Sequence, residues 1–189
     1  MGVGPVEAVK RAVFLDRDGV INRAVVREGK PYPPASLVEM ELNEGVRDGL
    51  RSLRAEGYKL LVVTNQPDVA RGTQSREAIE RMHEWLGEEL PIDDFFVCYH
   101  DSGDGCACRK PRPGLLHQGA EKYGIDLGSS YVIGDRWRDV DAGAAAGCRT
   151  VWIDYGYQER GPTEPPDARV ASVRQAVEWI LSQGAKTSE

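Results

Sequence analysis

The chain has 189 residues, 41% hydrophobic and 29% charged, with a formal net charge of −6. This length suits one domain with a full core, so we expect a single domain over residues 1–189. The negative charge argues against a nucleic acid or a membrane surface as partner. No apolar run approaches the ~18 residues of a membrane span. Residues 1–10 lack the pattern of a secretion signal, which favours a cytoplasmic protein. No apolar stripe beyond the core ones is evident, which favours a monomer.

Strands and helices are predicted to alternate after a loose arm at residues 1–11 and before a polar tail at 183–189. The expected strands are 12–16, 58–64, 95–99, 130–134 and 149–153. The expected helices are 45–57, 75–90, 114–123, 139–146 and 171–181. This alternation predicts an α/β fold, a Rossmann-like three-layer sandwich with a mainly parallel sheet. The proline-rich connection at 23–43 is too short for a large cap domain, but it starts close enough to reach the end of the first strand.

Two acids follow the first strand. Asp16 ends the apolar run, and Asp18 comes two residues later, before Gly19. Carboxylates this close repel each other unless a cation lies between them, which indicates a magnesium site. The alternative is that Asp16 caps the turn and that Asp18 and Gly19 only form it.

Other polar residues also follow strands or precede helices. Thr64 and Asn65 end the second strand, Asp135 ends the fourth, and Arg109 and Lys110 precede the third helix. Parallel strands bring such residues to one edge of the sheet. Carboxylates for magnesium with a hydroxyl, a lysine and an arginine for phosphate suit phosphoryl transfer. The chain has no P-loop, no dinucleotide glycine motif and no Gly-x-Ser-x-Gly, so water or a carboxylate is the expected nucleophile.

A compact polar loop at 98–108 carries four potential metal ligands, Cys98, His100, Cys106 and Cys108. Three thiolates and one imidazole suit a closed tetrahedral zinc of the structural type. The alternative is three reduced cysteines and a histidine in a turn. Because Cys108 directly precedes Arg109, zinc here would anchor the phosphate-binding residues. Cys148 lies outside the cluster and is expected to be a buried core thiol, and His83 is expected on the surface of its helix.

Four short motifs occur in order along the chain. They are Asp16-Arg17-Asp18-Gly19, Thr64-Asn65-Gln66, Arg109-Lys110-Pro111, and Gly134-Asp135 with Asp139. With them the chain resembles the haloacid dehalogenase superfamily of phosphatases. The stretches FLDRDGVIN, VVTNQPDVARG, CACRKPRPG and VIGDRWRDVDAGAAAG are similar to its heptose bisphosphate phosphatase and histidinol-phosphatase subgroup, over most of residues 12–155.

The resemblance implies roles for the acids. Asp16 would be the nucleophile and a ligand of Mg²⁺. Asp18 would be the acid/base, with a raised effective pKa in the substrate complex, and its backbone carbonyl would be a metal ligand. Asp135 would be the last magnesium ligand and Asp139 a supporting acid. The zinc loop is also a feature of the resembled subgroup.

The resemblance also implies a substrate class. Thr64, Asn65 and Lys110 would hold the phosphoryl group, and Arg109 would help to recognise the substrate. That substrate would be a small sugar phosphate, D-glycero-D-manno-heptose 1,7-bisphosphate cleaved at its 7-phosphate. Histidinol phosphate, another small phosphomonoester, and a non-catalytic zinc-stabilised binding module are the alternatives. The long 23–43 loop and Arg136 depart from the subgroup, and Arg27, Lys30 or Arg136 could hold a second phosphate or be surface charges.

Overall fold

A single six-stranded sheet runs through the computed structural model, which describes residues 9–185. The strand order is β5-β4-β1-β6-β7-β8, and every neighbouring pair is parallel. The strands are β1 (Ala12–Leu15), β4 (Lys59–Asn65), β5 (Asp94–Cys98), β6 (Tyr131–Gly134), β7 (Arg149–Ile153) and β8 (Ala168–Val170). The predicted Rossmann-like α/β fold is confirmed.

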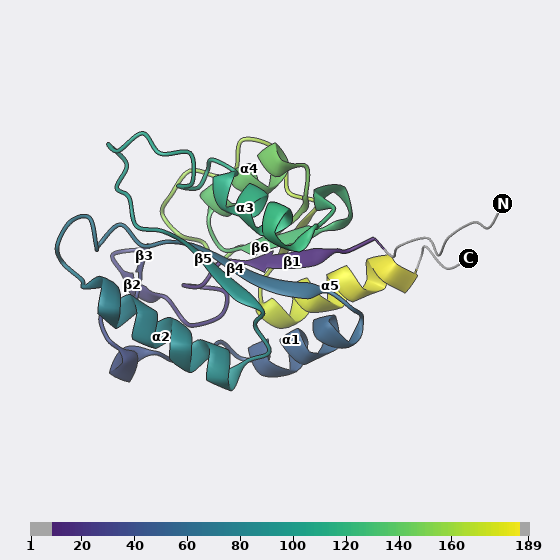
Figure 1. The fold of residues 1–189 in the computed structure, drawn as a ribbon, viewed down its shortest axis with the longest axis horizontal. Helices are drawn as coiled ribbons and strands as arrows, with labels where there is room; N and C mark the ends of the chain where they lie inside the picture. The colour runs from purple at the N-terminus through teal and green to yellow at the C-terminus, as the bar shows by residue number, and fades with distance from the viewer. Residues whose placement is uncertain (1–8, 186–189) are drawn as a thin grey trace.

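Five α-helices cover the two faces of this sheet. They are α1 (Val46–Ala55), α2 (Arg76–Glu89), α3 (Gly114–Tyr123), α4 (Trp137–Ala146) and α5 (Val173–Ala185). In Figure 1, α1, α2 and α5 lie below the sheet, and α3 and α4 lie above it. Two short 3-10 helices, Leu37–Glu39 and Leu127–Ser129, lie in connections. No described helix is long and apolar enough to cross a bilayer.

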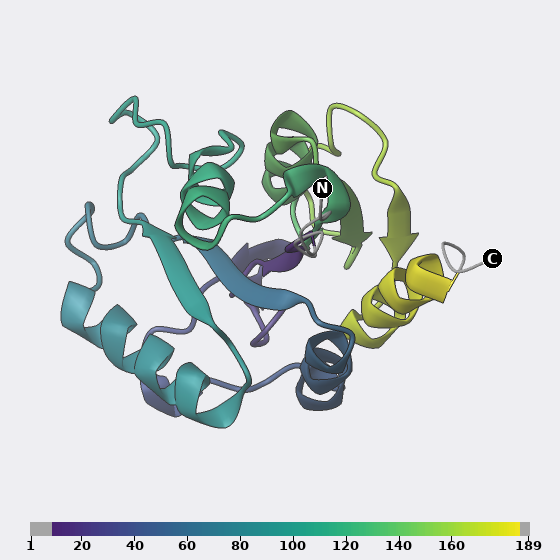
Figure 2. The ribbon, with the colours of Figure 1, turned by 45° about the vertical axis from the view of Figure 1, so that its right-hand side comes forward.

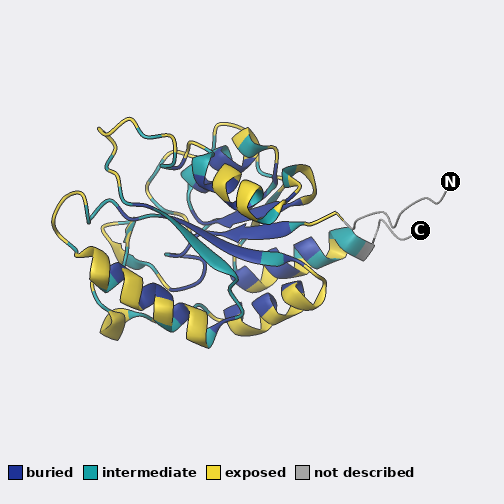
Figure 3. Cartoon of the chain, in the orientation of Figure 1, coloured by how far each residue is buried: buried dark blue, intermediate teal, exposed yellow. Residues whose placement is uncertain are grey.

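The central strands are the most deeply buried part of the protein (Figure 3). Alternate residues of β1 enter different apolar clusters, since Val13 and Leu15 face α1 and α5, whereas Ala12 and Phe14 face α3. This two-sided burial explains why the β1 sequence is continuously apolar. Cys148 belongs to the cluster around α3 and α4, so the prediction of a buried core thiol is confirmed.

Two parts of the sheet structure were not predicted. The 23–43 connection contains a hairpin of β2 (Val25–Arg27) and β3 (Lys30–Tyr32), closed by Glu28 and Gly29, which both have positive φ. Positive φ at both turn positions defines a type I′ turn, which glutamate rarely forms. Strand β8 is only three residues long and joins the sheet edge beside α5 (Figure 2). Segments this short carry no usable periodicity.

The chain ends differ from expectation in one respect. Helix α5 continues to Ala185, so the predicted end of the helix at 181 and start of the tail at 183 are too early. Residues 1–8 and 186–189 lie outside the described residues, and with them most of the predicted arm and the end of the predicted tail. The prediction of a surface histidine on α2 is wrong, because His83 is only 7% exposed.

Candidate active site

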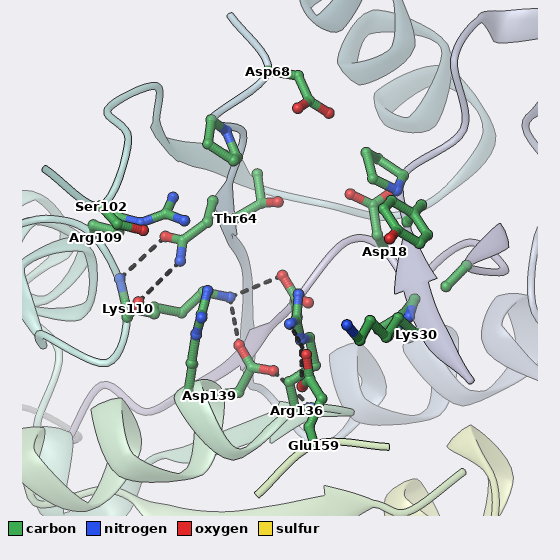
Figure 4. A pocket seen from close by; sticks show the side chains of 18 of the residues that line it. Asp18, Lys30, Thr64, Asp68, Ser102, Arg109, Lys110, Arg136, Asp139 and Glu159 are labelled. Carbon is green, nitrogen blue, oxygen red and sulfur yellow. Dashed lines mark hydrogen bonds and ion pairs between the residues drawn. The ribbon is translucent and has the colours of Figure 1, made fainter. Parts of the chain in front are cut away.

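The sheet order brings the polar strand ends together. Strand β1 lies between β4 and β6, so Asp16, Thr64 and Asp135 follow three neighbouring strands at the same edge. A cavity of about 330 Å³ opens there, lined among others by Asp16, Thr64 and Lys110. Lys110 and Asp139 lie on one side of this cleft, and Asp18 and Lys30 lie on the other (Figure 4). Asp16, Thr64 and Asn65 line this cavity, whereas Asp135 is buried behind it and does not.

The ammonium group of Lys110 connects two of the acids. Its Nζ donates to Asp16 Oδ1 at 2.8 Å and to the carbonyl of Val63 at 2.7 Å, and it lies 2.6 Å from Asp139 Oδ1. Burial alone would lower the pKa of Lys110, but Asp139 and Asp16 raise it well above its usual range. The lysine therefore stays protonated as a fixed positive charge beside Asp16.

The main chain of Lys110 is also held. Asn65 Nδ2 donates to the Lys110 carbonyl at 3.0 Å, and the Lys110 amide donates to Asn65 Oδ1 at 3.1 Å. The Asn65 side chain lines the cleft, and both of its polar atoms form hydrogen bonds with the Lys110 main chain. Thr64 is 1% exposed, and its hydroxyl accepts from Gln66 Nε2 at 3.0 Å. Its hydroxyl proton is left to donate to a ligand oxygen.

Asp16, Asp135 and Asp139 form a buried acidic cluster whose ligand atoms lie within 4.8 Å of one another. Neither oxygen of Asp135 accepts a hydrogen bond of ordinary geometry from the described residues. Burial and the charges of Asp16 and Asp139 raise its pKa well above the ordinary value, with Tyr157 offsetting part of the rise. Buried carboxylate oxygens without a partner are costly unless a cation pairs with them. The donor set therefore fits a hard divalent cation such as Mg²⁺.

The three acids are not equivalent as ligands. Asp139 Oδ1 pairs with Lys110, and its Oδ2 accepts from the Arg136 amide at 3.1 Å as part of the cap of α4. That leaves Asp135 and the second oxygen of Asp16 as the open ligand atoms of the cluster. Burial, together with repulsion from Asp139 and Asp18, raises the pKa of Asp16 to about 6 even though Lys110 opposes the rise. A bound cation would return it to the ionised form.

Gly19 allows the loop after β1 to approach the acidic cluster. Its φ is +96°, and a Cβ there would lie 1.9 Å from Asp135 Oδ2. Any side chain would be both strained and in contact with the proposed metal ligand. The glycine in the Asp-x-Asp-Gly motif is therefore required by the close approach of two chain segments.

The Asp18 side chain is not part of the acidic cluster. Its two oxygens accept from Arg17 Nε at 3.1 Å and Nη2 at 2.9 Å, from Asn22 Nδ2 at 3.0 Å and from Gln66 Nε2 at 2.8 Å. Burial would raise the pKa of Asp18, but the Arg17 charge and these hydrogen bonds bring it below the ordinary value. Without substrate, Asp18 is therefore held as a carboxylate. The sequence motif contains Arg17 and Gln66, but their role was not predicted.

The cysteine–histidine loop gathers four potential metal ligands. Cys108 Sγ lies 3.2 Å from Cys98 Sγ and 3.3 Å from His100 Nδ1, and Cys98 Sγ lies 3.7 Å from Cys106 Sγ. A tetrahedron with Zn–S bonds of 2.3 Å has S···S edges of about 3.8 Å. All four predicted ligands come together, with their ligand atoms within 4.8 Å of one another, as a group that could hold a metal ion.

This loop also carries the cleft arginine. Arg109 Nη1 donates to the His100 carbonyl at 3.1 Å, and the Gly114 amide that opens α3 donates to the Ala107 carbonyl at 3.2 Å. Asp101 of the same loop accepts a two-pronged contact from Arg71 at 2.7 Å for each bond. Hydrogen bonds thus connect the candidate metal ligands to the arginine of the cleft and to the start of α3.

Several cations line the mouth of the cleft. Arg136, which was considered for a second phosphate, is instead paired with Glu159 through Nε at 2.9 Å and through Nη2. Lys30 and Arg138 line the cavity and form no ion pair with any described residue. Burial and the charges of Arg136 and Arg109 lower the pKa of Arg138. Arg138 was not recognised in the sequence, where it lies just before the predicted helix 139–146 and belongs to no motif.

Comparisons with known proteins show the family of this chain. A family model described as HAD-hydrolase-like matches residues 107–176. D-glycero-beta-D-manno-heptose-1,7-bisphosphate 7-phosphatase from Salmonella typhi is 36% identical over 90% of this chain and 89% of its own. D-glycero-alpha-D-manno-heptose-1,7-bisphosphate 7-phosphatase from Photorhabdus laumondii is 34% identical over 82% of this chain and 88% of its own.

A solved structure is similar as well. D,D-heptose 1.7-bisphosphate phosphatase from B. bronchiseptica, complexed with magnesium and phosphate, has a TM-score of 0.74 and 27% identity over 93% of this chain and 99% of its own. The resemblance seen in the sequence motifs is confirmed. The chain belongs to the heptose-1,7-bisphosphate 7-phosphatase family of the HAD-like hydrolases and is a phosphoric monoester hydrolase.

Proposed function

We propose that this enzyme removes the 7-phosphate of D-glycero-D-manno-heptose 1,7-bisphosphate, with Mg²⁺, through an aspartyl phosphate on Asp16. The observation that carries this proposal is the contact of Lys110 with Asp16 beside the unpartnered carboxylate of Asp135. A nucleophile, a fixed cation and an open metal ligand then surround one point in the cleft. The names of the relatives support the substrate.

In the first half of the reaction, an Asp16 oxygen attacks phosphorus and the bond to the sugar oxygen breaks. Lys110 and the Thr64 hydroxyl stabilise the charge that builds up on the phosphoryl oxygens. Asp18 gives a proton to the departing alcohol. Because its pKa is low without substrate, the charge of the bound phosphate must raise it so that Asp18 enters this step protonated.

In the second half, water attacks the aspartyl phosphate. Asp18, now a carboxylate, takes a proton from that water, and Asp16 is released together with inorganic phosphate. The hydrogen bonds from Arg17, Asn22 and Gln66 favour the carboxylate form that this step needs.

The metal requirement follows from the acidic cluster. Asp16, Asp135 and the backbone carbonyl of Asp18 would hold Mg²⁺, which when bound supplies a positive charge to the phosphate and to the nucleophile. Zinc at Cys98, His100, Cys106 and Cys108 would have a structural role, because four protein ligands leave no position for substrate. Zinc would affect catalysis indirectly, because it would anchor the loop that positions Arg109 and Lys110.

The charges at the mouth of the cleft favour a bisphosphate. Arg109, Arg138 and Lys30 line it without a carboxylate partner among the described residues. They suit a second phosphate, whereas the ammonium group of histidinol phosphate would be repelled. Cytoplasmic location and a monomeric state remain predictions from the sequence.

The test is release of inorganic phosphate from a panel that contains both anomers of the heptose bisphosphate and histidinol phosphate. We expect the highest kcat/KM with one heptose anomer, and no turnover when Mg²⁺ is removed. A preference for histidinol phosphate would contradict the substrate, and no turnover of any member would favour a binding module. Asp16→Asn should abolish turnover, since an amide cannot form the phosphoenzyme; full activity in that variant would refute the nucleophile.

A further inference from the structure

We propose that His83 of α2 is a positioning residue that orients the acid/base Asp18 through the buried guanidinium of Arg17. The inference rests on the proposed function, because only there is Asp18 given the proton-transfer role. His83 lies 66 positions from Arg17 in the sequence. It belongs to none of the four motifs and does not line the cleft.

Arg17 is the link between helix and site. Its side chain is fully buried, so every one of its N–H groups needs an acceptor inside the protein. Nε and Nη2 form a fork on the two oxygens of Asp18, at 3.1 and 2.9 Å. The third nitrogen, Nη1, lies 3.2 Å from His83 Nε2 and 3.9 Å from the weakly accepting sulfur of Met82.

The roles in this contact follow from its chemistry. Arginine can only donate, so His83 Nε2 accepts, and the imidazole is neutral with its proton on Nδ1. The His83 ring is fixed by stacking on Phe95 of β5, with centroids 4.7 Å apart and planes 14° from parallel. The acceptor is thus held by packing between a helix and an edge strand, and it does not depend on the active-site loop.

The guanidinium is planar, so fixing its third nitrogen fixes the fork as well. Without His83, the one hydrogen-bond partner left to Nη1 among the described residues would be the weakly accepting sulfur of Met82, and the plane would tilt toward another acceptor. The two contacts to Asp18 would move with it. Asn22 and Gln66 each hold one oxygen of Asp18, but neither defines the plane of the carboxylate.

A positioning role and a purely structural role predict different kinetics. Loss of Asp18 alignment harms reactions whose leaving group needs a proton, such as sugar alcohols. It spares p-nitrophenyl phosphate, whose leaving group departs as a stable anion. The quantity to compare is kcat/KM, because it covers the steps up to the departure of the alcohol and excludes hydrolysis of the phosphoenzyme.

The variants are His83→Leu, which removes the acceptor, and His83→Gln, whose amide oxygen falls near the position of Nε2. General acid–base catalysis typically contributes about 10²–10⁴-fold to the rate. We expect His83→Leu to lose part of this contribution, about tenfold in kcat/KM for the sugar phosphate. The loss for p-nitrophenyl phosphate should stay within about twofold, and His83→Gln should restore the sugar-phosphate rate. If the Leu variant does not fold, His83→Asn, too short to reach Nη1, should show the same selective loss.

The matched control is Ile79→Val, a change to a fully buried residue one turn earlier on α2. It should lower Tm without changing the ratio of kcat/KM for the sugar phosphate to kcat/KM for p-nitrophenyl phosphate. An equal loss on both substrates for His83→Leu, or the same selective loss for Ile79→Val, would overturn the inference. Asp18→Asn distinguishes failure of the proposed acid role of Asp18 from failure of the positioning role of His83. If it spares the sugar phosphate, the proposed acid role fails; if it harms the sugar phosphate while His83→Leu does not, only the positioning role fails.

Discussion

The side chain of Asn65 and the main chain of Lys110 hold each other through two hydrogen bonds of 3.0 and 3.1 Å, across 45 positions of sequence. Asn65 ends β4, whereas Lys110 follows the cysteine–histidine loop. The pair therefore fixes that loop to the sheet edge at the point where the Lys110 side chain enters the acidic cluster.

Replacing Asn65 with Ala should reduce catalysis more than stability. Two hydrogen bonds of about 1 kcal/mol each are lost, and Lys110 moves away from the phosphoryl group. We expect kcat/KM to fall by at least about tenfold, as each 1.4 kcal/mol of lost transition-state stabilisation is a factor of ten. Steady-state kinetics and thermal unfolding measure the two effects. Gln175→Ala on α5, which removes a cap contact far from the cleft, is the control. Unchanged kinetics for Asn65→Ala would contradict the role.

Removing zinc should weaken substrate binding and stability together. A chelator that leaves Mg²⁺ bound, or Cys106→Ser, frees the loop that carries Arg109 and Lys110. Ordering these long side chains then costs about 1.5–2 kcal/mol each. We expect a higher KM, a lower kcat and a lower Tm. Cys148→Ala, outside the cluster, should lower Tm alone. Full turnover and an unchanged Tm in the zinc-free enzyme would rule out the proposal that zinc anchors Arg109 and Lys110.

Substitution of Gly19 tests the metal site without changing a carboxylate. In Gly19→Ala the new Cβ meets Asp135 at 1.9 Å, so Asp135 or the loop must move. We expect loss of turnover and loss of the Mg²⁺-induced rise in Tm, which depends on binding to the folded state. Gly57→Ala is the control, because φ is +83° and nothing lies within 4 Å. It should cost only about 1 kcal/mol of backbone strain. A normal Mg²⁺ response in Gly19→Ala would argue against Asp135 as a ligand.

Arg138 should determine the preference for a bisphosphate. In Arg138→Gln, we expect KM for the bisphosphate to rise about tenfold, because charge-assisted hydrogen bonds are worth about 1.5–3 kcal/mol. A matching monophosphate, which has no group at this position, should be affected little. Arg169→Gln, whose side chain pairs with Asp154 on the surface, is the control. An equal effect on both substrates would show that Arg138 does not contact the second phosphate.

His83 should make the folded state sensitive to acid. Burial and the Arg17 charge lower its pKa from 6.5 to about 3. The unfolded chain therefore takes up a proton at a pH where the folded protein does not, so stability falls as pH drops below 6.5 toward 3. The free energy of unfolding falls by about 1.4 kcal/mol for each pH unit in this window, and it does not change above the window. Chemical unfolding of wild type and His83→Gln measures it. The difference between them should change across pH 6.5 to 4, and a constant difference would contradict the assignment of a buried neutral histidine.

Local sequence patterns were sufficient to predict the fold class and to group most residues of the candidate site. Asp16, Thr64 and Asp135 were predicted together because apolar runs end at them, and parallel strands bring such ends to one edge. Cys98, His100, Cys106 and Cys108 were grouped by spacing within one loop. Both inferences depend on local patterns, which a single sequence displays directly.

The partners of the remaining side chains became visible only in the folded chain. Arg17 is buried in contact with His83, and Arg136 is paired with Glu159, whereas Arg138 lines the cleft without an ion pair to any described residue. None of these pairings has a sequence signal, because each joins elements far apart in the chain through packing geometry. The contact between the Asn65 side chain and the Lys110 main chain is also a long-range contact without a sequence signal. Residue types and spacing indicated what chemistry the strand ends can perform, and long-range contacts decided which residues hold the reacting groups in place.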